Sequence, residues 1–323
     1  MQQARLNVLR SSPRDRGVYR DLCGLMDVSL FPDNSYLHVG SGREVFEVDL
    51  KRLKEVYGRR RRIDESVIRE LRLKTGYSEF ASTAMGVVIP GSTVKGNVRA
   101  RLELSFHGFN GKVRSCFLRA SRIVKVEKGG SGWRHQRVWS ETVFEDRGPP
   151  CDYTRMDNVC LICDLFGTAG LKSLIEFSDF IGSNVKLEAL DLPYGMKVYA
   201  APPGSEFNGE ISFMNLKDYE LGLLLLGMGV MNGSFGRSVI LGRFKYRGLM
   251  DNKKFGRVKY KVNRISLNRY SSKLVINDLT INPGDHIEGE KLDTLCKVLA
   301  NLSLKHFENE FRIVDEVEIL EKL

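Results

Sequence analysis

Two segments in the second half of the chain alternate apolar and polar residues, the pattern of a half-buried strand. They are "EFNGEISFMNL", residues 206–216, and "GRVKYKVNRISL", residues 256–267. The second follows "SVILGRFKYRG", residues 238–248, and the pair predicts a hairpin joined by "LMDNKKF". Shorter strand-like runs occur in "SLIEFSDF", residues 173–180, and on both sides of a Pro-Asp-Asn turn within residues 25–42. The chain is therefore predicted to contain a sheet of short strands.

Three segments have the apolar spacing of helices. Val94, Val98 and Leu102 recur every four residues, which predicts one buried helix face with Ser92 as the N-cap. Residues 217–232 are apolar on several sides and predict a buried helix. A C-terminal helix is indicated by Leu292, Leu295, Cys296, Leu299 and Leu302.

Short strands interleaved with two main helices predict an α+β fold, with a ferredoxin-like or RNA-recognition-motif-like core that carries long insertions. We expect one elaborated domain over residues 1–323. Its core is expected at about 22–42, 86–107, 164–180 and 202–270, with insertions at about 43–85 and 108–163 and a C-terminal helical segment at 285–323.

Composition narrows the class of partner. The chain has 323 residues, of which 42% are hydrophobic, and a net charge of +10, which favours a polyanionic partner. The longest apolar run, Leu221 to Met231, contains glycines and is about half the ~20 residues that a membrane-spanning helix needs. No membrane partner is expected. Because residues 1–21 lack the apolar core of a secretory signal, we expect a cytoplasmic protein.

The segment "VVIPGSTVKGNVRARLEL", residues 87–104, resembles half of a phosphate-binding loop. A Walker A loop requires Gly-Lys followed by Ser or Thr, but here Lys95 precedes Gly96, so an ATPase is not predicted. Lys95 and Arg99 lie one helical turn apart near the expected N-terminus, where free amides favour phosphate. A glycine inside a helix also favours close approach of another backbone, from protein or nucleic acid. The alternative is a solvated basic face.

A second basic segment, residues 228–260, interleaves glycines with cationic residues. The pattern suits a backbone that lies along a phosphate chain, although glycine-rich hairpins also occur without nucleic acid. Its cationic residues are Arg237, Arg243, Lys245, Arg247 and Arg257.

Three of the six cysteines have the spacing of a metal site. Cys151 precedes the pair Cys160 and Cys163, and a Cys-x-x-Cys pair suits a tetrahedral structural zinc site. The fourth ligand is expected to be His135, with Cys116 and His107 as alternatives. Three ordinary buried cysteines are the competing interpretation.

Taken in order, several motifs resemble those of the RAMP superfamily, and within it the backbone subunit that coats the guide RNA in type III CRISPR effector complexes. These motifs are "LHVGSG", "IDESVIR", "IPGSTVKGNVR", "CLICDLFGTAGLKSLIEFSDF", "PPGSEFNGEI", "ILGRFKYRG" and "FGRVK". The resemblance extends from about Leu37 to Val258. It implies a ferredoxin-like core with inserted lobes, a zinc-bound insertion, and a guide RNA held by the Pro-Gly-Ser helix and the glycine-rich loop.

Carried over residue by residue, the resemblance implies that the guide RNA contacts two groups of residues. The first is Gly91, Ser92, Lys95 and Arg99, and the second is Arg237, Gly242, Arg243, Lys245 and Arg257. Catalytic members cleave target RNA with a divalent metal and an aspartate in a motif that resembles Ile-Asp-Ser-Pro-Val-Ile-Arg. Here "IDESVIR" offers Asp64 without the proline, Asp49 is the alternative, and Mg²⁺ or Mn²⁺ is the implied cofactor. A helix N-cap is the competing role of Asp64.

Three functions remain open from the sequence. The first is a guide-RNA-binding subunit that stacks head to tail with copies or paralogues, binds target RNA beside other CRISPR effector subunits in antiviral defence, and cleaves target RNA at Asp64. The second is a non-catalytic scaffold paralogue in the same complex. The third is a free-standing RAMP endoribonuclease that processes precursor RNA.

Overall fold

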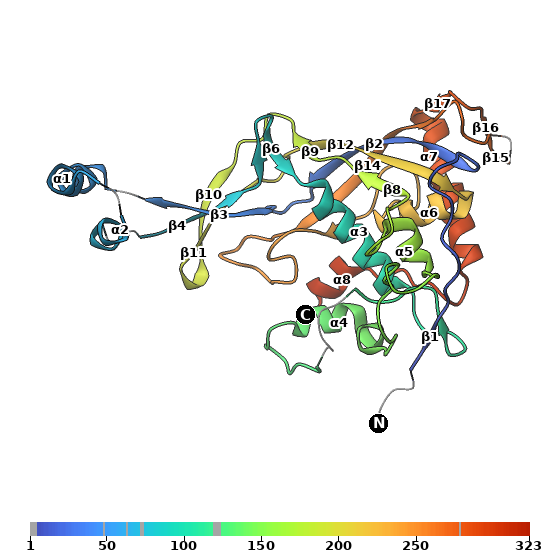
Figure 1. The fold of residues 1–323 in the computed structure, drawn as a ribbon, viewed down its shortest axis with the longest axis horizontal. Helices are drawn as coiled ribbons and strands as arrows, with labels where there is room; N and C mark the ends of the chain where they lie inside the picture. The colour runs from blue at the N-terminus through green and yellow to red at the C-terminus, as the bar shows by residue number, and fades with distance from the viewer. Residues whose placement is uncertain (1–4, 48, 63, 72–73, 119–123, 278) are drawn as a thin grey trace.

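The computed structural model describes the chain except residues 1–4, 48, 63, 72–73, 119–123 and 278. Within these residues the largest sheet has nine strands in the order β13-β14-β2-β12-β9-β6-β5, with β17 and β8 at its sides (Figure 1). Its strands are β2 (Leu22–Pro32), β5 (Ser82–Thr83), β6 (Gly86–Ile89), β8 (Ile175–Phe177), β9 (Phe180–Gly182), β12 (Phe207–Leu216), β13 (Val239–Ile240), β14 (Arg257–Leu267) and β17 (His286–Ile287). The predicted α+β class is confirmed.

The centre of this sheet has the strand order β14-β2-β12-β8, and each neighbouring pair is antiparallel. Helix α3 (Gly91–Ser105) lies between β2 and β8 in the sequence, and α6 (Asp218–Gly227) lies between β12 and β14. The two helices contact each other beside the sheet. This arrangement of two split βαβ units fits the expected ferredoxin-like core.

The local patterns explain the core elements. In β14, Val258, Tyr260 and Val262 are buried on alternate positions, as a strand with one covered face requires. Helix α6 is buried on all sides from Glu220 to Gly227, as its apolar sequence predicts. It ends before the predicted residue 232, because the chain turns at Met228 and Gly229.

Helix α3 has the predicted buried face, since Val94, Val98 and Leu102 are at most 1% exposed. The predicted N-cap is wrong: the helix begins at Gly91 and its N-cap is Pro90, not Ser92. A Cβ at Gly91 would lie 2.2 Å from Phe177 O, so this position requires glycine and fixes the start of the helix against the turn between β8 and β9.

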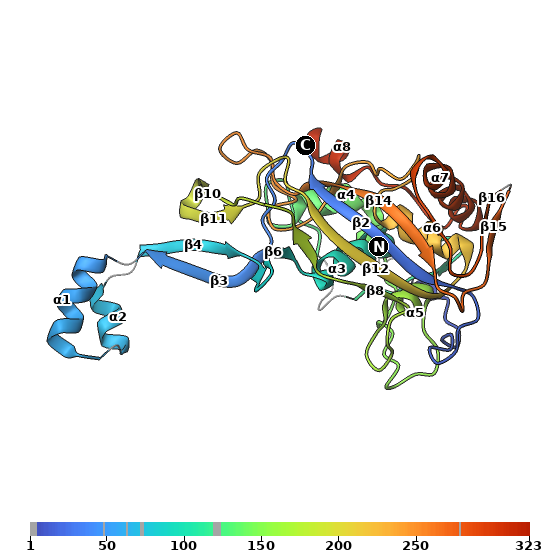
Figure 2. The same cartoon turned by 90° about the horizontal axis from the view of Figure 1, so that it is seen from above.

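The predicted insertion at 43–85 forms an arm that extends away from the body (Figures 1 and 2). Strands β3 (Gly40–Glu47) and β4 (Lys74–Phe80) make its shaft, and helices α1 (Leu50–Arg60) and α2 (Glu65–Leu71) make its tip. Strand β4 also pairs with β11 (Met196–Ala200), which forms a hairpin with β10 (Glu188–Leu192) across the turn η2 (Pro193–Gly195). The arm contains two helices, whereas the sequence analysis indicated only the helix that Asp64 could cap.

The predicted hairpin of residues 238–267 is only partly formed. Strand β13 has two residues, and residues 241–256 make a long loop in which Gly242 and Phe244 have positive φ angles of 83° and 66°. Such left-handed positions interrupt regular pairing. We call residues 241–256 the glycine-rich loop.

The remaining elements lie around this core. They are β1 (Asn7–Val8), β7 (Lys112–Val113), α4 (Trp133–Trp139), η1 (Ser140–Phe144), α5 (Leu161–Phe166), β15 (Leu274–Ile276), β16 (Leu279–Ile281), α7 (Gly289–His306) and α8 (Glu316–Glu321). Helix α7 confirms the expected C-terminal helix. Across the described residues, no helix combines the length and apolar character that crossing a membrane would require.

The N-terminal segment is fastened to the body by arginines. Arg14 Nε lies 2.7 Å from Asp164 Oδ2, and its Nη1 also donates to Glu220. Arg16 Nη1 lies 2.8 Å from Asp164 Oδ1. Residues 14–16 therefore join α5 to α6 through a largely buried ionic network.

Candidate metal centre and nucleic-acid interface

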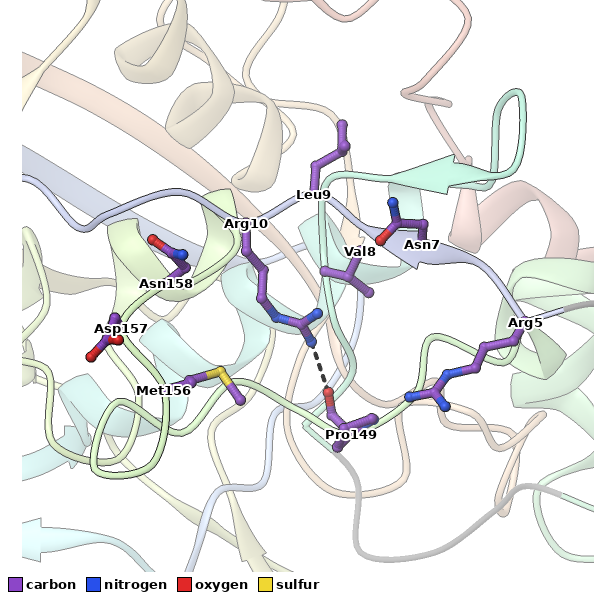
Figure 3. Close-up of a pocket in the computed structure, with 9 residues that line it drawn as sticks. All are labelled: Arg5, Asn7, Val8, Leu9, Arg10, Pro149, Met156, Asp157 and Asn158. Carbon is purple, nitrogen blue, oxygen red and sulfur yellow. Dashed lines mark hydrogen bonds between the residues drawn. The ribbon is translucent and has the colours of Figure 1, made fainter.

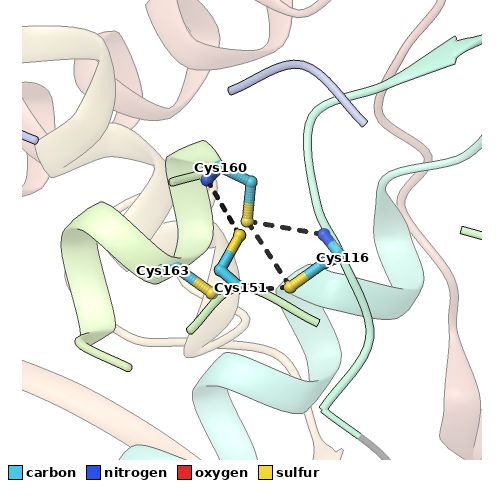
Figure 4. A group of neighbouring side chains, drawn as sticks. All are labelled: Cys116, Cys151, Cys160 and Cys163. Carbon is cyan, nitrogen blue, oxygen red and sulfur yellow. Dashed lines mark hydrogen bonds between the residues drawn. The ribbon is translucent and has the colours of Figure 1, made fainter. Parts of the chain in front are cut away.

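Four buried cysteines, Cys116, Cys151, Cys160 and Cys163, converge beside α5 (Figure 4). Cys160 is the N-cap of α5 and Cys163 lies in its first turn, which explains the Cys-x-x-Cys spacing. Cys116 comes from the segment after β7, and Cys151 comes from the loop before α5. All four Sγ atoms lie within 4.8 Å of one another.

The separations fit a tetrahedral zinc ion. Cys116 Sγ lies 3.5 Å from Cys163 Sγ and 3.7 Å from Cys160 Sγ. Four ligands placed ~2.3 Å from zinc would be about 3.8 Å apart. With four thiol ligands and no open position, such a site would stabilise the fold rather than catalyse a reaction.

The predicted fourth ligand is corrected: the structure places Cys116 in the group, and His135 outside it. His135 lies in α4, and its ring packs edge-on against Tyr246 with centroids 5.0 Å apart. Cys116 was the alternative weighed in the sequence analysis. The sequence does not reveal that Cys116 belongs with the other three cysteines, because only tertiary packing brings the segment after β7 to α5.

Hydrogen-bond donors surround the thiols. Arg99 Nη2 lies 3.2 Å from Cys163 Sγ, and Arg10 Nε lies 3.4 Å from Cys151 Sγ. The backbone amides of Cys116 and Cys160 donate to Cys160 and Cys151. These donors would stabilise the excess negative charge of four thiolates around one divalent ion.

Arg10 also connects the cysteines to the N-terminal segment (Figure 3). Its Nη2 donates to Pro149 O at 2.9 Å, at the edge of a cavity of about 530 Å³ between β1 and the loop that carries Cys151. The arginine therefore braces the loop that carries Pro149 and Cys151.

The N-terminus of α3, where the sequence predicts an anion site, is occupied by protein groups. Asp179 Oδ1 accepts from the amide of Gly91 at 2.8 Å. Lys95 Nζ donates to Ser173 at 2.6 Å and lies 3.1 Å from Glu176 Oε2. The predicted pair of phosphate contacts is thus divided, because Lys95 faces β8 and Arg99 faces the cysteines.

Arg99 makes two further contacts besides the one with Cys163. It donates to Gly167 O and lies 2.7 Å from Glu103. Burial lowers the pKa of Arg99, but the Glu103 carboxylate more than offsets this, so the net pKa is raised and the guanidinium stays charged.

Two other residues that were predicted to contact RNA bind groups of the protein itself. Arg257 is 5% exposed, and its Nη1 donates to Lys245 O and Phe255 O at 2.7 Å each. Arg237 donates to Val314 O at 2.7 Å and lies 3.4 Å from Asp315. Arg257 shapes the glycine-rich loop from inside, and Arg237 holds the segment before α8.

Three other predicted residues, Gly242, Arg243 and Lys245, line a cavity of about 690 Å³ between the glycine-rich loop and residues 129–135. We call it the two-loop cavity. Its cationic side chains come from Arg134, Arg243, Lys245 and Arg247, and its aromatic rings from Trp133, His135, Phe244 and Tyr246. No carboxylate lines it in the part of the chain that the structure describes.

Gly242 is fixed in this wall by the backbone. A Cβ there would lie 2.8 Å from His38 O, and its φ of 83° favours glycine. Sequence reasoning missed the opposite wall, residues 129–135. The available signal was compositional, because "GGSGWRH" repeats the mixture of glycine, cation and aromatic ring found in the glycine-rich loop.

Lys245 is the most perturbed cation of the cavity. Burial and then the neighbouring Arg101 lower its pKa to about 8, with only partial opposition from Glu316. Among the described residues no carboxylate is paired with its ammonium, which lies 5.7 Å from the centroid of the Tyr246 ring. An anionic ligand would raise the pKa of Lys245.

Both candidate catalytic aspartates cap helices of the arm. Asp64 Oδ1 accepts from the amides of Ser66 and Val67 at 3.0 and 3.1 Å, and its Oδ2 lies 2.9 Å from Arg62. The pKa of Asp64 is lowered, and the hydrogen bond from the Ser66 hydroxyl is the largest cause. Asp49 caps α1 through the amides of Lys51 and Arg52.

Neither aspartate lies in a ligand cluster of the described chain, where the cysteines alone form a group of three or more potential metal ligands. The catalytic role of Asp64 stays a prediction.

A model of the RAMP superfamily matches residues 34–323, which is most of the chain. The chain therefore belongs to the RAMP superfamily, and the resemblance inferred from its motifs is confirmed at this level. A search of curated proteins returned no match. Membership supports a CRISPR-associated, RNA-binding role.

Proposed function

We propose that this protein is a backbone subunit of a type III CRISPR effector complex and holds guide RNA by its phosphates at the two-loop cavity. The observation that carries the proposal is the charge of the cavity: four cationic side chains line it, and no carboxylate among the described residues does. Elsewhere, cations such as Lys95, Arg99 and Arg101 are paired with acidic residues. Unpaired positive charge in a concave site favours a polyanion.

The ligand is single-stranded RNA in this proposal, because the cavity combines cations with aromatic rings. Proteins that bind single strands pair a basic groove with rings on which bases stack. Arg243 already lies over the Phe244 ring, with its Cζ 5.0 Å from the centroid. Nearby, Met196 of the β10–β11 hairpin lines the cavity, and Tyr194 at the hairpin tip is 92% exposed.

Helix α3 offers a second place for the RNA backbone. Ser92, Gly96 and Ala100 follow one another at four-residue spacing on its exposed side. Apart from its chain neighbours and the backbone of its own helix, no described atom lies within 4 Å of the position that a Cβ of Gly96 would occupy. Close approach by this chain's own backbone therefore does not explain the glycine, whereas approach by a nucleic-acid backbone does.

The other parts of the proposal follow from this role. A zinc ion would hold together the segments that carry the four cysteines. Target RNA would pair with the bound guide. Copies or paralogues would stack head to tail beside the other effector subunits. A cytoplasmic location suits both the RNA and the free thiols.

The test is RNA binding by a charge-reversed cavity. We expect the double variant Lys245→Glu/Arg247→Glu to bind guide-length single-stranded RNA more than tenfold more weakly, because two phosphate contacts are replaced by repulsion. The slope of log affinity against log salt should fall by about two. Fluorescence anisotropy of labelled RNA measures both quantities.

The matched control is Lys297→Glu/Lys305→Glu, which makes the same change of net charge on the exposed side of α7. Equal loss in the two double variants would mean that overall charge, not the cavity, determines binding. That result would contradict the proposal.

A further inference from the structure

The tip of the arm, helices α1 and α2, exposes basic and apolar residues together. Lys51, Arg52 and Lys54 are exposed on α1, and no described carboxylate forms an ion pair with any of them. On the same pair of helices, Leu50 is 68% exposed and Ile68 is 47% exposed. We call this surface the arm tip.

The described residues of the arm tip bury few side chains. The buried side chains described there are Val56 of α1 and Val67 of α2. Figures 1 and 2 show both helices at the end of the β3–β4 shaft, apart from the body. Helices this short are marginal without packing partners, so a further surface that covers Leu50 and Ile68 would stabilise them.

The exposed side chains indicate a protein partner rather than RNA. A phosphate chain would use the cations but would leave Leu50 and Ile68 in water. A protein surface with acidic and apolar residues would use both kinds of side chain.

Such a surface lies at the opposite end of the molecule's long axis (Figure 1). It comprises Val275 of β15, Asp285, and Glu288 and Glu290 at the start of α7, and we call it the acidic corner. Val275 is 53% exposed and the three acidic residues are exposed. None of the described lysines or arginines forms an ion pair with these three carboxylates.

We infer that the arm tip of one copy docks on the acidic corner of the next copy. The inference rests on the stacking in the proposed function and specifies the two surfaces that perform it. Because they lie at opposite ends of one chain, the contact is heterologous and leaves a free surface at each end, so it extends a row of subunits.

Charge reversal at each surface tests the inference. We expect Lys51→Glu/Arg52→Glu/Lys54→Glu and, separately, Asp285→Lys/Glu288→Lys/Glu290→Lys to weaken self-association at least tenfold, because each variant faces like charge across the contact. Sedimentation velocity of the full chain with guide-length RNA measures the association.

An equimolar mixture of the two variants is the decisive sample. The reversed arm of one variant then meets the reversed corner of the other, while the two unreversed surfaces also match. Assembly should return in alternating order to near the wild-type level. Both variants alone should still bind RNA with wild-type affinity, because their two-loop cavities are unchanged.

Four results would overturn the inference, three from the variants and one from the wild-type chain. Those from the variants are wild-type assembly by both variants, failure of the mixture to recover, and lost RNA affinity in the arm variant with normal assembly by the corner variant. Lost RNA affinity in the arm variant would mean that the arm binds RNA, and it would not contradict the proposed function. A wild-type chain that binds RNA but does not associate would contradict the docking alone, whereas unchanged RNA binding by Lys245→Glu/Arg247→Glu would contradict the proposed function.

Discussion

Arg99 Nη2 lies 3.2 Å from Cys163 Sγ, so a residue that the resemblance places on guide RNA is hydrogen-bonded to the cysteine group. The helix that carries it, α3, is also the central helix of the core. The candidate metal centre and the core therefore share a direct contact, and we expect a change at Arg99 to affect metal retention first.

Replacing Arg99 with Lys tests this contact. Lysine keeps the positive charge beside Glu103 but cannot reproduce the three contacts of the planar guanidinium. We expect Arg99→Lys to weaken zinc binding by about tenfold, measured by competition with a coloured chelator. The control is Lys95→Met, one turn earlier and away from the thiols. Identical zinc affinity in the two variants would assign Arg99 a purely structural role.

The ligand set gives a second prediction. Cys116→Ala should lose bound zinc and make residues 151–163 sensitive to protease, because three thiols cannot complete the tetrahedron. His135→Ala should retain one zinc per chain by elemental analysis. Cys296→Ala, a buried cysteine outside the group, controls for the loss of a thiol. Zinc loss in His135→Ala but not in Cys116→Ala would restore the original ligand assignment.

The lowered pKa of Lys245 predicts a pH dependence of RNA binding. Its ammonium is charged below a pKa of about 8 and neutral above it, so this contribution to affinity is present at pH 7 and is lost as the pH rises to 9. Bound phosphate will shift the loss somewhat upward. Lys245→Arg should bind equally at both pH values, because arginine stays charged.

The stability of the fold should change with pH in the opposite direction to the RNA affinity. The pKa of Lys245 is depressed in the folded chain, so between about pH 8 and the ordinary lysine pKa the unfolded chain binds more protons. The free energy of unfolding should therefore rise with pH across this window, relative to that of Lys245→Met. Urea titrations at several pH values check this, and a parallel profile for the two proteins would contradict it.

Asp64 can be examined with two substitutions that separate capping from catalysis. Asn ranks with Asp as an N-cap, whereas Ala does not. We expect Asp64→Asn to preserve α2 and Asp64→Ala to speed hydrogen exchange at Ser66 and Val67 about fivefold. If Asp64→Asn loses Mg²⁺-dependent cleavage of target RNA while α2 persists, the catalytic prediction is supported; retained cleavage contradicts it.

The buried pair Arg101 and Glu316 joins α3 to α8, with Nε at 3.0 and 2.9 Å from the two carboxylate oxygens. Removing one charge leaves the other uncompensated, so Glu316→Gln should lower the free energy of unfolding by about 3–5 kcal/mol. Denaturant unfolding measures the loss. The matched change Glu318→Gln, at an exposed carboxylate in the same helix, should have little effect.

The sequence predicted the elements whose patterns are local. Alternation in β12 and β14 and the four-residue spacing of Val94, Val98 and Leu102 each reflect one covered face, so the strands and α3 were found. Helix α1 was missed because Val56 alone is buried there and makes no apolar stripe. Its signal was the cap at Asp49, which the resemblance treated only as a candidate catalyst.

The site was predicted less completely because its geometry depends on tertiary packing. The spacing of Cys160 and Cys163 is a property of one turn, whereas Cys116 arrives from a distant segment. Lys95 and Arg99 are neighbours on α3, but α5 and β8 decide what each one contacts. Residue types therefore indicated a basic surface, and packing determined which cations remained available to a ligand.

The arginine anchors at residues 14–16 have a practical consequence for handling the protein. A shortened chain that starts at residue 17 would keep every main strand of the sheet. It would leave the carboxylates of Asp164 and Glu220 without the arginines that pair with them. Removing residues 14–16 would therefore loosen the contact between α5 and α6.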